Sequence, residues 1–402
     1  MVHVQFKIDN MNMKKYKLGD LLSEFHAGKA IQTENVKNKG AYPVYGGNGQ
    51  RGYTDSYNQD GEYLIIGRQG AYCGNVRYNI GKAYLTEHAI VGQAKENHNP
   101  IYIALKLSLM KLSQLQGQSA QPGLSVNTLS CISMEMHPKE IQDKIADIML
   151  KLDRKIELNK QINDNLEAMA KQLYDYWFVQ FDFPNEEGKP YKSSGGAMVW
   201  NENLKREIPQ GWVVEKMGKC TNVLLGGTPD TNDNSLWGNG YNWLNSGEVA
   251  EFPILKSEKN ITPKGLEKSA TVLAPKGSVT LSITRHLRPS ILCIDACINQ
   301  SVVAILENDK ISKEYIYPLL NRDIPRLMSL RTGAQQPHIN KETVEAINVV
   351  LPPANIMGAY INKAESIYNA IFNNAKEVEE LTKQRDELLP LLMNGQASVN
   401  SD

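Results

Sequence analysis

Two segments in the first half of the sequence carry residue types that phosphate binding or catalysis would need. The first, Gly47-Asn-Gly-Gln-Arg-Gly52, has the spacing of a dinucleotide-binding loop, which must follow a strand and open a helix. The residues that come next, Tyr53 to Gly61, are rich in turn formers and predict no helix. We therefore interpret the segment as a surface loop whose glycines let the backbone and Arg51 approach a groove or a phosphate.

The second segment contains Glu87 and His88, a carboxylate beside an imidazole that could act as an acid–base pair. The corresponding positions in the second half of the sequence are Gln300 and Ser301, which argues against a catalytic role shared by both halves. The sequence has no Asn-Pro-Pro-aromatic motif, Walker loop, His-Glu-x-x-His or nucleophile elbow. These observations indicate a binding protein without a reactive centre of its own.

Arginine and glutamine side chains stand among glycines after matching strands in both halves. Arginine can read guanine through two hydrogen bonds, and glutamine can read adenine in the same way. We expect DNA contacts from Arg51, Arg68, Gln69, Tyr72, Arg77, Gln118 and Gln121 in the first half, and from Arg285, His286, Arg288, Arg331, Gln335, Gln336 and His338 in the second. Because the two sets differ, they predict two different half-sites read from one scaffold.

The scaffold is a duplication. Gln336-Pro337 repeats Gln121-Pro122 at an offset of 215 residues, and the pattern that follows repeats without a gap as far as Pro138 and Pro353. Short β-branched strands bounded by glycine precede a helical segment in each half. Each half is therefore predicted to be a mixed α/β domain of about 125–145 residues.

A long helix is predicted at the end of each half. Steps of four and three residues give a coiled-coil seam at Ile141, Ile145, Ile148, Leu152, Lys155, Asn159, Ile162, Leu166, Met169, Leu173 and Tyr176. A helix of about 36 residues would be about 54 Å long. The second helix is predicted from about Ile356 to Met393. We expect the two helices to pack antiparallel and to hold the domains at a fixed separation; the alternative is that each packs only on its own domain.

The composition restricts the class of protein. The net charge is zero, so the chain as a whole has no electrostatic attraction to nucleic acid. The 5 cysteines are scattered and lack zinc spacing, which indicates reduced thiols. The sequence shows neither an apolar signal segment nor a run long enough to span a membrane. We expect a cytoplasmic protein.

Several motifs spread over nearly the whole sequence resemble those of one family. They are Gly46-Gly-Asn-Gly49, Gly61-Glu-Tyr-Leu-Ile-Ile-Gly-Arg68, Tyr174-Asp-Tyr-Trp-Phe-Val-Gln-Phe-Asp-Phe-Pro-Asn185, Ile208-Pro-Gln-Gly-Trp212, Gly226-Gly-Thr-Pro229, Ala334-Gln-Gln-Pro337 and Val349-Val-Leu-Pro-Pro353. In this duplicated order the sequence resembles the specificity subunits of type I restriction–modification enzymes.

The resemblance implies two target recognition domains, each binding half of a bipartite sequence in double-stranded DNA, with Thr228 among the contacts. It also implies two spacer helices that dock two methyltransferase subunits, joined by ATP-dependent restriction and translocation subunits. Catalysis, S-adenosylmethionine, ATP and Mg would then belong to the partners, with no cofactor or metal in this chain. The expected docking positions are Ile141, Leu152, Asn159, Leu166, Leu173, Ile367, Asn374, Leu381 and Leu388. Lys363, Glu377 and Gln384 depart from the apolar pattern of the second helix.

The expected fold class is mixed α/β, with two duplicated target recognition domains separated by two long antiparallel coiled-coil helices. The expected boundaries are 1–15 for a leader, 16–138 for the first recognition domain, 139–180 for the first spacer helix, 181–210 for a linker, 211–353 for the second recognition domain, 354–395 for the second spacer helix and 396–402 for a tail. Two alternatives stay open: a self-contained nuclease or methyltransferase, and a coiled-coil scaffold that binds only protein or carbohydrate.

Overall fold

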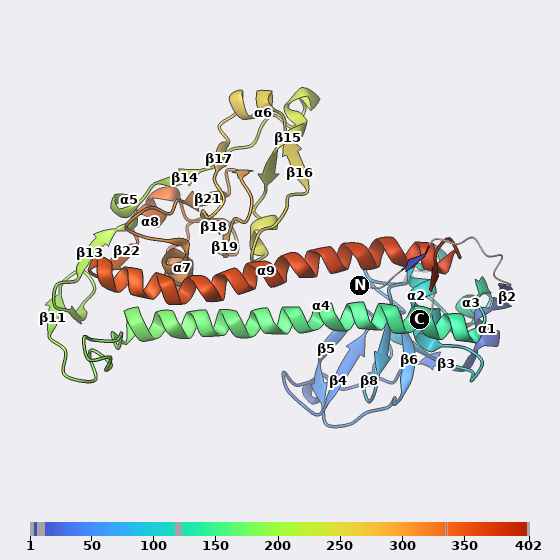
Figure 1. The fold of residues 1–402 in the computed structure, drawn as a ribbon. Helices are drawn as coiled ribbons and strands as arrows, with labels where there is room; N and C mark the ends of the chain where they lie inside the picture. The colour runs from blue at the N-terminus through green and yellow to red at the C-terminus, as the bar shows by residue number, and fades with distance from the viewer. Residues whose placement is uncertain (1–3, 6–12, 117–122, 334, 336, 400–402) are drawn as a thin grey trace. The chain divides into compact units, whose positions relative to one another are not determined.

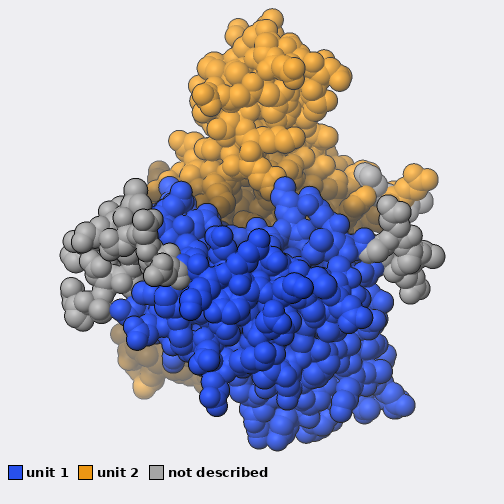
Figure 2. Space-filling model, turned by 90° about the vertical axis from the view of Figure 1, so that its right-hand side faces the viewer, with its two compact units in different colours: residues 1–156, 380–402 blue, residues 157–379 orange. Residues whose placement is uncertain are grey.

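The computed structural model describes residues 4–5, 13–116, 123–333, 335 and 337–399, so Gln118, Gln121 and Gln336 lie outside the described residues. The chain divides into two compact units, coloured separately in Figure 2. Unit 1 comprises residues 1–156 and 380–402, and unit 2 comprises residues 157–379. Each unit contains sheets, helices and its own buried core, as the duplicated α/β pattern predicts.

Unit 1 is built on a four-stranded antiparallel sheet in the order β3-β9-β6-β7. Its strand β6 is apolar on both faces and is buried on both, as a central strand should be. Leu64 and Ile66 enter the main core of the unit, whereas Tyr63 and Ile65 enter a smaller core beside a second sheet, β5-β4-β8. The bounds are β3 Leu22–Ala27, β4 Tyr42–Gly46, β5 Gly49–Thr54, β6 Glu62–Gly67, β7 Val76–Ile80, β8 Tyr84–Leu85 and β9 Ala89–Ala94.

Unit 2 repeats this plan. A four-stranded antiparallel sheet, β14-β21-β18-β19, takes the place of the sheet that contains β6, and a second sheet has the order β16-β15-β20-β17. One helix covers the main sheet in each unit: α2 (Pro100–Ser108) packs on β6 and β7, and α7 (Lys313–Ser329) packs on β18 and β19. The strand bounds are β14 Val223–Leu225, β15 Trp237–Leu244, β16 Lys259–Ile261, β17 Val272–Ala274, β18 Val279–Ser282, β19 Pro289–Ile291, β20 Ala296–Ile298 and β21 Val302–Ile305.

A two-stranded antiparallel ladder leads into each long helix. In unit 1, β2 (Lys14–Lys17) pairs with β10 (Ser133–Met136). In unit 2, β13 (Val213–Lys216) pairs with β22 (Asn348–Leu351). The remaining strands are β1 Val4–Gln5, paired with β23 Ser398–Val399, and the hairpin of β11 Met198–Asn201 and β12 Arg206–Pro209. The short α-helices are α1 Leu18–Leu21, α3 Val126–Ser130, α5 Met217–Cys220, α6 Pro263–Glu267 and α8 Lys341–Glu345. The 3-10 helices are η1 Thr33–Asn35, η2 Leu112–Leu115, η4 Asn234–Leu236 and η5 Glu248–Ala250, and the π-helical turn η3 Asp175–Val179 follows α4.

Two helices are much longer than the rest, α4 (Lys139–Tyr174) and α9 (Ala354–Met393) (Figure 1). Each contributes to both units. In unit 1, the first part of α4 shares a core with the last part of α9, and in unit 2 the last part of α4 shares a core with the first part of α9. The two helices are therefore antiparallel, as predicted. In the described part of the chain, no helix combines the length and the apolar character that crossing a membrane requires.

The buried seam of α4 differs in phase from the prediction. Ile162, Met169 and Tyr176 have exposed fractions of 45%, 53% and 36%, and Lys155 is also exposed. The buried and half-buried residues at heptad spacing are Ile145, Met149, Leu152, Ile156, Asn159, Asn163, Leu166, Ala170, Leu173 and Trp177. Both patterns contain positions 145, 152, 159, 166 and 173. They differ because Trp177 and Tyr174 join the aromatic core of unit 2, which turns Tyr176 outward.

A polar contact sits within this seam. Asn159 is buried, and its Nδ2 donates a hydrogen bond to Oε2 of Glu377, 2.8 Å away on α9. Nearby, Asn163 Nδ2 donates to the backbone oxygen of Ile371 at 3.1 Å. These contacts account for Glu377, one of the residues that breaks the apolar pattern of the second helix. A buried polar pair of this kind favours one packing register over its neighbours.

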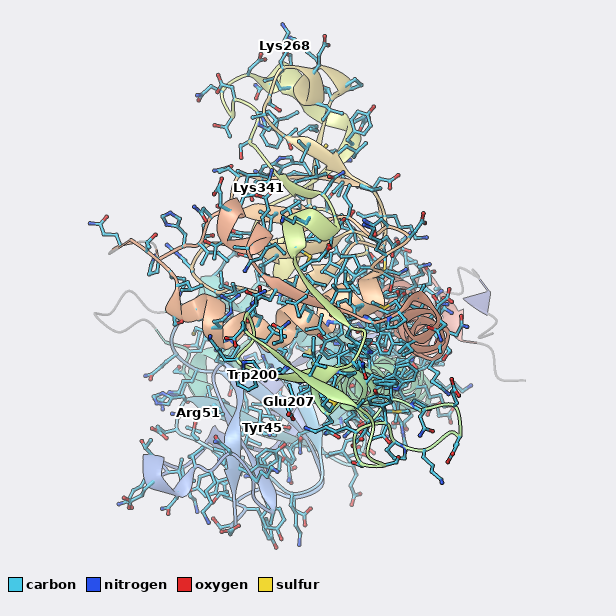
Figure 3. The ribbon with its side chains drawn as sticks, turned by 90° about the vertical axis from the view of Figure 1, so that its left-hand side faces the viewer. Tyr45, Arg51, Trp200, Glu207, Lys268 and Lys341 are labelled. Carbon is cyan, nitrogen blue, oxygen red and sulfur yellow. The ribbon has the colours of Figure 1, made fainter. Side chains whose placement is uncertain are left out.

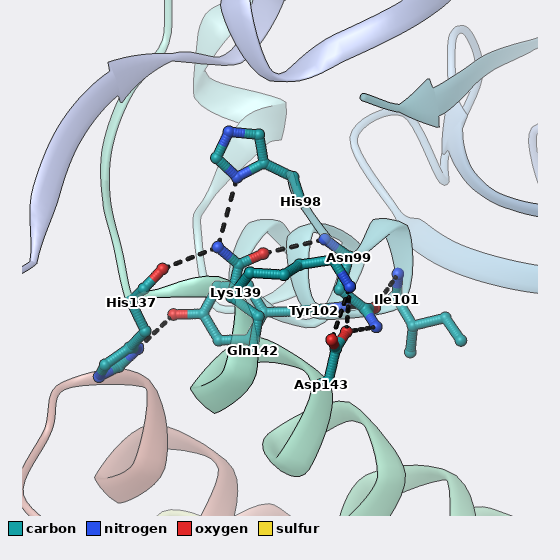
Figure 4. A network of polar contacts seen from close by, with 8 residues as sticks. All are labelled: His98, Asn99, Ile101, Tyr102, His137, Lys139, Gln142 and Asp143. Atoms are coloured by element: carbon teal, nitrogen blue, oxygen red, sulfur yellow. Dashed lines mark hydrogen bonds and ion pairs between the residues drawn. The ribbon is translucent and has the colours of Figure 1, made fainter. Parts of the chain in front are cut away.

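A second polar network fixes the start of α4 in unit 1 (Figure 4). Gln142 is buried; its Nε2 donates to the backbone oxygen of His137, and its Oε1 accepts from the backbone nitrogen of Asn99. Asn99 in turn caps α2 through Oδ1 and donates to Asp143 through Nδ2. Tyr102 Oη lies 2.6 Å from His137 Nδ1. The network therefore ties the first turn of α2 to the first turn of α4.

Candidate functional site

In unit 1, three loops meet beside the carboxyl end of β6. The segment after β6 begins with Arg68, whose backbone nitrogen donates to the oxygen of His88 at 2.9 Å and whose oxygen accepts from Leu124 at 2.9 Å. Gln69 forms an isolated β-bridge with Gly123. Tyr72, in the same segment, is 51% exposed. These backbone hydrogen bonds, which we call the backbone frame, hold the loop and its side chains in place.

The turn between β4 and β5 brings two predicted arginines to the same place. The Arg77 guanidinium lies so close to Gly49 that a Cβ there would be 1.7 Å from Nη1, and Gly49 has a φ of +101°. Arg51 is exposed (Figure 3), and its Cδ lies so close to Gly46 that a Cβ there would be 2.9 Å away. Arg77 also acts on the phenol of Tyr45, whose pKa burial raises most and Arg77 partly lowers again. The glycines thus make room for two cations.

Glu87 and His88 belong to this cluster. The sequence comparison excluded a catalytic pair common to both halves and left their role in unit 1 open. Glu87 Oε1 lies 3.2 Å from His88 Nε2, and His88 Nδ1 lies 3.2 Å from Gln69 Oε1. The other carboxylate oxygen of Glu87 is buried without a hydrogen-bond partner, and so is the hydroxyl of Thr86. A carboxylate accepts hydrogen bonds from the amino group of cytosine. Nothing in the sequence indicated that Glu87 could contact a base, because an isolated Glu is most often a solvated surface residue.

Unit 2 contains the same backbone frame with other side chains. Ile283 donates to the oxygen of Ser301 at 2.9 Å and accepts from Ile339 at 3.0 Å, which repeats the bonds of Arg68. Thr284 bridges His338, and Arg285 donates from its backbone nitrogen to Pro337. Arg331 Nη1 donates to the backbone oxygen of Arg285 at 2.6 Å. The structure therefore brings together Arg285, Arg331 and His338.

The other predicted residues of unit 2 lie around this group. His286, Arg288 and Gln335 are exposed. Arg288 accepts a backbone hydrogen bond from Ser282 in the same loop. Thr228 is hydrogen-bonded to Gln300, which occupies the position of Glu87 in unit 1. Both units thus present exposed polar side chains from loops that a repeated hydrogen-bond frame holds in place.

The thiols have the properties of buried structural residues. Cys73, Cys220 and Cys297 are buried and free. Burial raises the pKa of Cys220 and Cys297 to about 11, and it raises the pKa of Cys73 and Cys293 as well. These four would be weak nucleophiles at neutral pH. Within the described ranges, no group of three or more His, Cys, Asp and Glu side chains could hold a metal ion.

The predicted docking positions lie on the inner side of the helices. Leu381 is 8% exposed, Asn159 is buried, and Ile141, Leu152, Leu166, Leu173, Ile367, Asn374 and Leu388 are partly buried. A different set of apolar side chains is exposed in unit 2: Leu158 at 48%, Ile162 at 45% and Met169 at 53% on α4, and Tyr176 at 36% in the π-helical turn η3 (Asp175–Val179) that continues it. We call these four residues the outer stripe. Their separations of four, seven and seven residues place them on one helix face.

Comparison with known proteins adds an independent line of evidence. Residues 10–168 and 209–385 match the family described as type I restriction modification DNA specificity domain. The chain is 39% identical over 154 residues to the EcoprrI type I restriction enzyme specificity subunit of Escherichia coli, a match that covers 37% of this chain and 38% of that subunit. It is 25% identical over 377 residues to the MjaIX specificity subunit of Methanocaldococcus jannaschii, covering 86% and 84%.

The fold also has a counterpart among solved structures. The crystal structure of the S subunit of a type I restriction–modification system from M. genitalium superposes with a TM-score of 0.64 at 15% sequence identity. The superposition covers 96% of this chain and 97% of that one. At this identity, the likeness shows the fold alone.

Proposed function

This chain belongs to the family of type I restriction–modification DNA specificity subunits, and from that premise we propose that each unit reads one half of a bipartite DNA sequence. The predicted domain boundaries and contact residues stay proposals within this scheme. In it, residues 16–138 and 211–353 are the recognition domains. The long helices α4 and α9 set the distance between the half-sites and dock two methyltransferase subunits.

The observation that supports half-site reading best is one hydrogen-bond frame with two sets of side chains. The frame bonds of Arg68 and Ile283 are the same in partner position and differ by at most 0.1 Å in length. Where unit 1 has Arg68, Gln69 and Glu87, unit 2 has a buried Ile283 followed by Thr284 and Gln300. A side chain on such a frame meets a base edge in a defined position, so a change of side chain changes the preferred base.

Fixed spacing follows from stiffness. Two half-sites on one face of B-DNA are separated by about one helical turn, roughly 34 Å. Two antiparallel helices joined by core contacts and by the Asn159–Glu377 hydrogen bond hold a length that a flexible linker would not. We infer that this helix pair restricts recognition to one spacer length.

The outer stripe supports docking. Large apolar side chains repeated along one exposed helix face are the pattern that a partner helix covers. The stripe is a better candidate for partner contact than the inner positions, because those side chains already contact residues of their own unit.

Catalysis is assigned to the partner subunits, together with S-adenosylmethionine, ATP and Mg. This assignment is supported by the difference between Glu87-His88 and Gln300-Ser301, since the two units would otherwise be expected to share a reactive pair. A methyltransferase that flips a base out of the duplex needs a protein that places it on the site. Partners in the complex are then double-stranded DNA, two methyltransferase subunits and ATP-dependent restriction subunits.

Two experiments test the proposal. In the first, residues 211–353 are replaced by the equivalent domain of another family member, and the methylated sequence of the host genome is read. One half-site should change and the other should persist; a change in both halves contradicts modular reading. Deleting the gene should remove the methylation mark altogether.

In the second experiment, the chain is co-expressed with its methyltransferase and the mass of the complex is measured. Ile162→Glu and Met169→Glu should each prevent assembly of one chain with two methyltransferases, because a carboxylate replaces an apolar side chain of the outer stripe. Ala168→Glu is the matched control, since Ala168 is exposed on α4 but lies one residue away from the stripe. Equal assembly of all three variants would contradict docking on the outer stripe.

A further inference from the structure

A cavity of about 440 Å³ lies within unit 2, and its lining includes none of the residues predicted to contact DNA. Four elements surround it: the end of α4, the loop between β11 and β12, the β13–β22 ladder and α7. The charged residues that line it are Arg206, Lys216, Arg322 and Arg326 on the basic side and Asp323 on the acidic side. The cavity is therefore strongly basic in a chain whose net charge is zero.

Two of these cations are positioned by neutral groups. The Arg206 Nη2 donates to the backbone oxygen of Val179 at 2.8 Å, and the guanidinium lies 4.4 Å from the ring centroid of Phe181. Lys216 Nζ donates to Asn348 Oδ1 at 2.7 Å and to the backbone oxygen of Ala346 at 3.2 Å. These contacts fix where the charges lie, and within the described ranges neither cation forms an ion pair.

The only carboxylate in the lining of this described cavity is already engaged. Asp323 is paired with Arg326 through two hydrogen bonds, one of them 2.8 Å long. Arg322, one residue earlier on α7, is exposed, and among the described residues it has no hydrogen bond or ion pair. Arg322 lies near enough to Arg206 to lower the pKa of that guanidinium further, after the larger effect of burial. An anion that entered the cavity would meet three cations without a counter-ion.

The fold does not require these charges, as unit 1 demonstrates. Its helix α2 begins at Pro100 after the cap Asn99, and α7 begins at Lys313 after Ser312. However, α2 has 9 residues whereas α7 has 17. The additional length of α7 carries Arg322, Asp323 and Arg326, and at the same offset unit 1 has Leu109, Met110 and Ser113. The arginine-bearing part of the cavity wall is thus a feature of unit 2, whereas unit 1 has a separate pocket of about 580 Å³, lined by Lys14, Lys95, Lys139 and Asp20, beside its β2–β10 ladder.

We propose that this cavity binds a phosphate group of the DNA backbone beside the half-site that unit 2 reads. The inference rests on the proposed DNA-reading function. Arginine forks fit phosphate oxygens through paired hydrogen bonds, and lysine adds a point charge. The additional length of α7 extends from Arg322, which lines the cavity, to Ser329, about 10 Å away along the helix. It ends beside the loop that contains Arg285. Beyond Ser329, Arg331 contacts Arg285 of that loop.

The asymmetry between the units favours DNA over a partner protein. Two identical methyltransferase subunits would need corresponding surfaces on both units, and Arg322 and Arg326 have no counterpart in unit 1. A phosphate contact carries no base information, so its effect should be the same for every sequence. It would extend the DNA footprint of unit 2 beyond the bases that are read.

The test uses the full chain, alone and with its methyltransferase subunits, and a random-sequence duplex as the probe. Arg322→Ala and Arg322→Glu change an exposed side chain, so both variants should fold. An unfolding temperature equal to that of wild type checks this. Lys268→Glu is the control for charge, because Lys268 is exposed in unit 2 (Figure 3) and is not among the residues that line the cavity. Affinity is measured over a series of salt concentrations.

The Arg322 variants should bind the duplex several-fold more weakly than wild type and Lys268→Glu. Their slope of log affinity against log salt should fall by about one. The ratio of affinities for recognised and random DNA should be unchanged. Duplex binding equal to that of wild type overturns the inference, while a wild-type chain that binds no DNA overturns the proposed function instead.

Two further outcomes identify another occupant and would equally overturn the inference. If inorganic phosphate raises the unfolding temperature of wild type but not of Arg322→Ala while duplex binding is unchanged, the cavity takes a free anion. If Arg322→Glu loses its methyltransferase but keeps duplex binding, the cavity takes an acidic segment of that partner.

Discussion

Gly70 and Arg285 occupy the same place in the two units, and both have a positive φ, +83° and +54°. Each follows the residue that bridges the segment before the long helix, Gln69 to Gly123 in unit 1 and Thr284 to His338 in unit 2. Glycine adopts this conformation without strain, whereas an arginine there costs about 1–2 kcal/mol. Unit 2 holds its arginine at this position in a loop that we propose to contact DNA, which is the pattern expected when function opposes stability.

Replacement of Arg285 should separate these two effects. Arg285→Gly relieves the backbone strain of the folded state but raises the conformational entropy of the unfolded chain. Because these effects oppose each other, the free energy of unfolding should be unchanged or rise by up to about 1 kcal/mol. Duplex binding should weaken. Arg285→Ala should lose the same affinity without any gain in stability, because alanine retains the strained φ. Thermal unfolding and gel shifts measure both; wild-type affinity in Arg285→Gly would show that the arginine does not contact DNA.

If unit 1 reads a half-site as proposed, Glu87→Gln should alter the base preference at one position of that half-site. A carboxylate only accepts hydrogen bonds, while an amide both donates and accepts, so discrimination for an amino group on the base should relax by about 1–3 kcal/mol. Selection from a pool of duplexes, or methylome sequencing, reads the change. The reciprocal variant Gln300→Glu should affect the other half-site only. An unaltered recognised sequence in a folded Glu87→Gln protein would remove Glu87 from the set of readers.

The Asn159–Glu377 hydrogen bond should contribute to the stability of the helix pair. Asn159→Leu leaves the half-buried Glu377 without this donor and should cost about 1–3 kcal/mol. The double variant Asn159→Leu/Glu377→Leu should recover most of the loss, because two apolar side chains of similar size can replace a buried polar pair. Denaturant unfolding of all four proteins gives the coupling energy. Strictly additive costs would mean that the two residues are not coupled.

Stability should also decrease in mild acid because of His137. Burial, and then the nearby Lys106, lower the pKa of His137 from 6.5 to about 4. Between these values the unfolded chain binds a proton that the folded chain does not, so stability is fully present above pH 6.5 and decreases as the pH falls towards 4. The total is about 3 kcal/mol. His137→Gln should show a smaller loss over this pH range; parallel curves for the two proteins would argue against the assignment.

The sequence predicted the duplication and the two long helices well, because both depend on local patterns. The repeat of Gln121-Pro122 at Gln336-Pro337 and the heptad spacing after Pro138 and Pro353 are visible without any tertiary information. The sequence did not predict which residues of α4 form the buried seam. Apolar residues at 156 and 162 fit two interleaved heptad patterns, and only the packing of Trp177 into the core of unit 2 selects one.

The candidate site was predictable only in part. Arg68 and Gln69 follow a recognisable strand, so their place on a loop could be inferred. The grouping of Glu87 with Gln69 depends on a turn between β8 and β9 that brings distant residues together. The basic cavity was not predictable at all, since Arg206 and Arg322 are far apart in the sequence and each has the form of an ordinary surface residue.

The way the chain passes between the units has a consequence for its synthesis. Unit 1 is formed from residues 1–156 and 380–402, and Leu389, Leu392 and Met393 lie in its core. A ribosome that has completed the first segment must add the whole of unit 2 before those leucines exist. At about 5–20 residues per second this takes roughly 10–45 s. During that interval unit 1 lacks part of its hydrophobic core. A chain interrupted before residue 380 would therefore be a substrate for chaperones and proteases before it could occupy any genomic site.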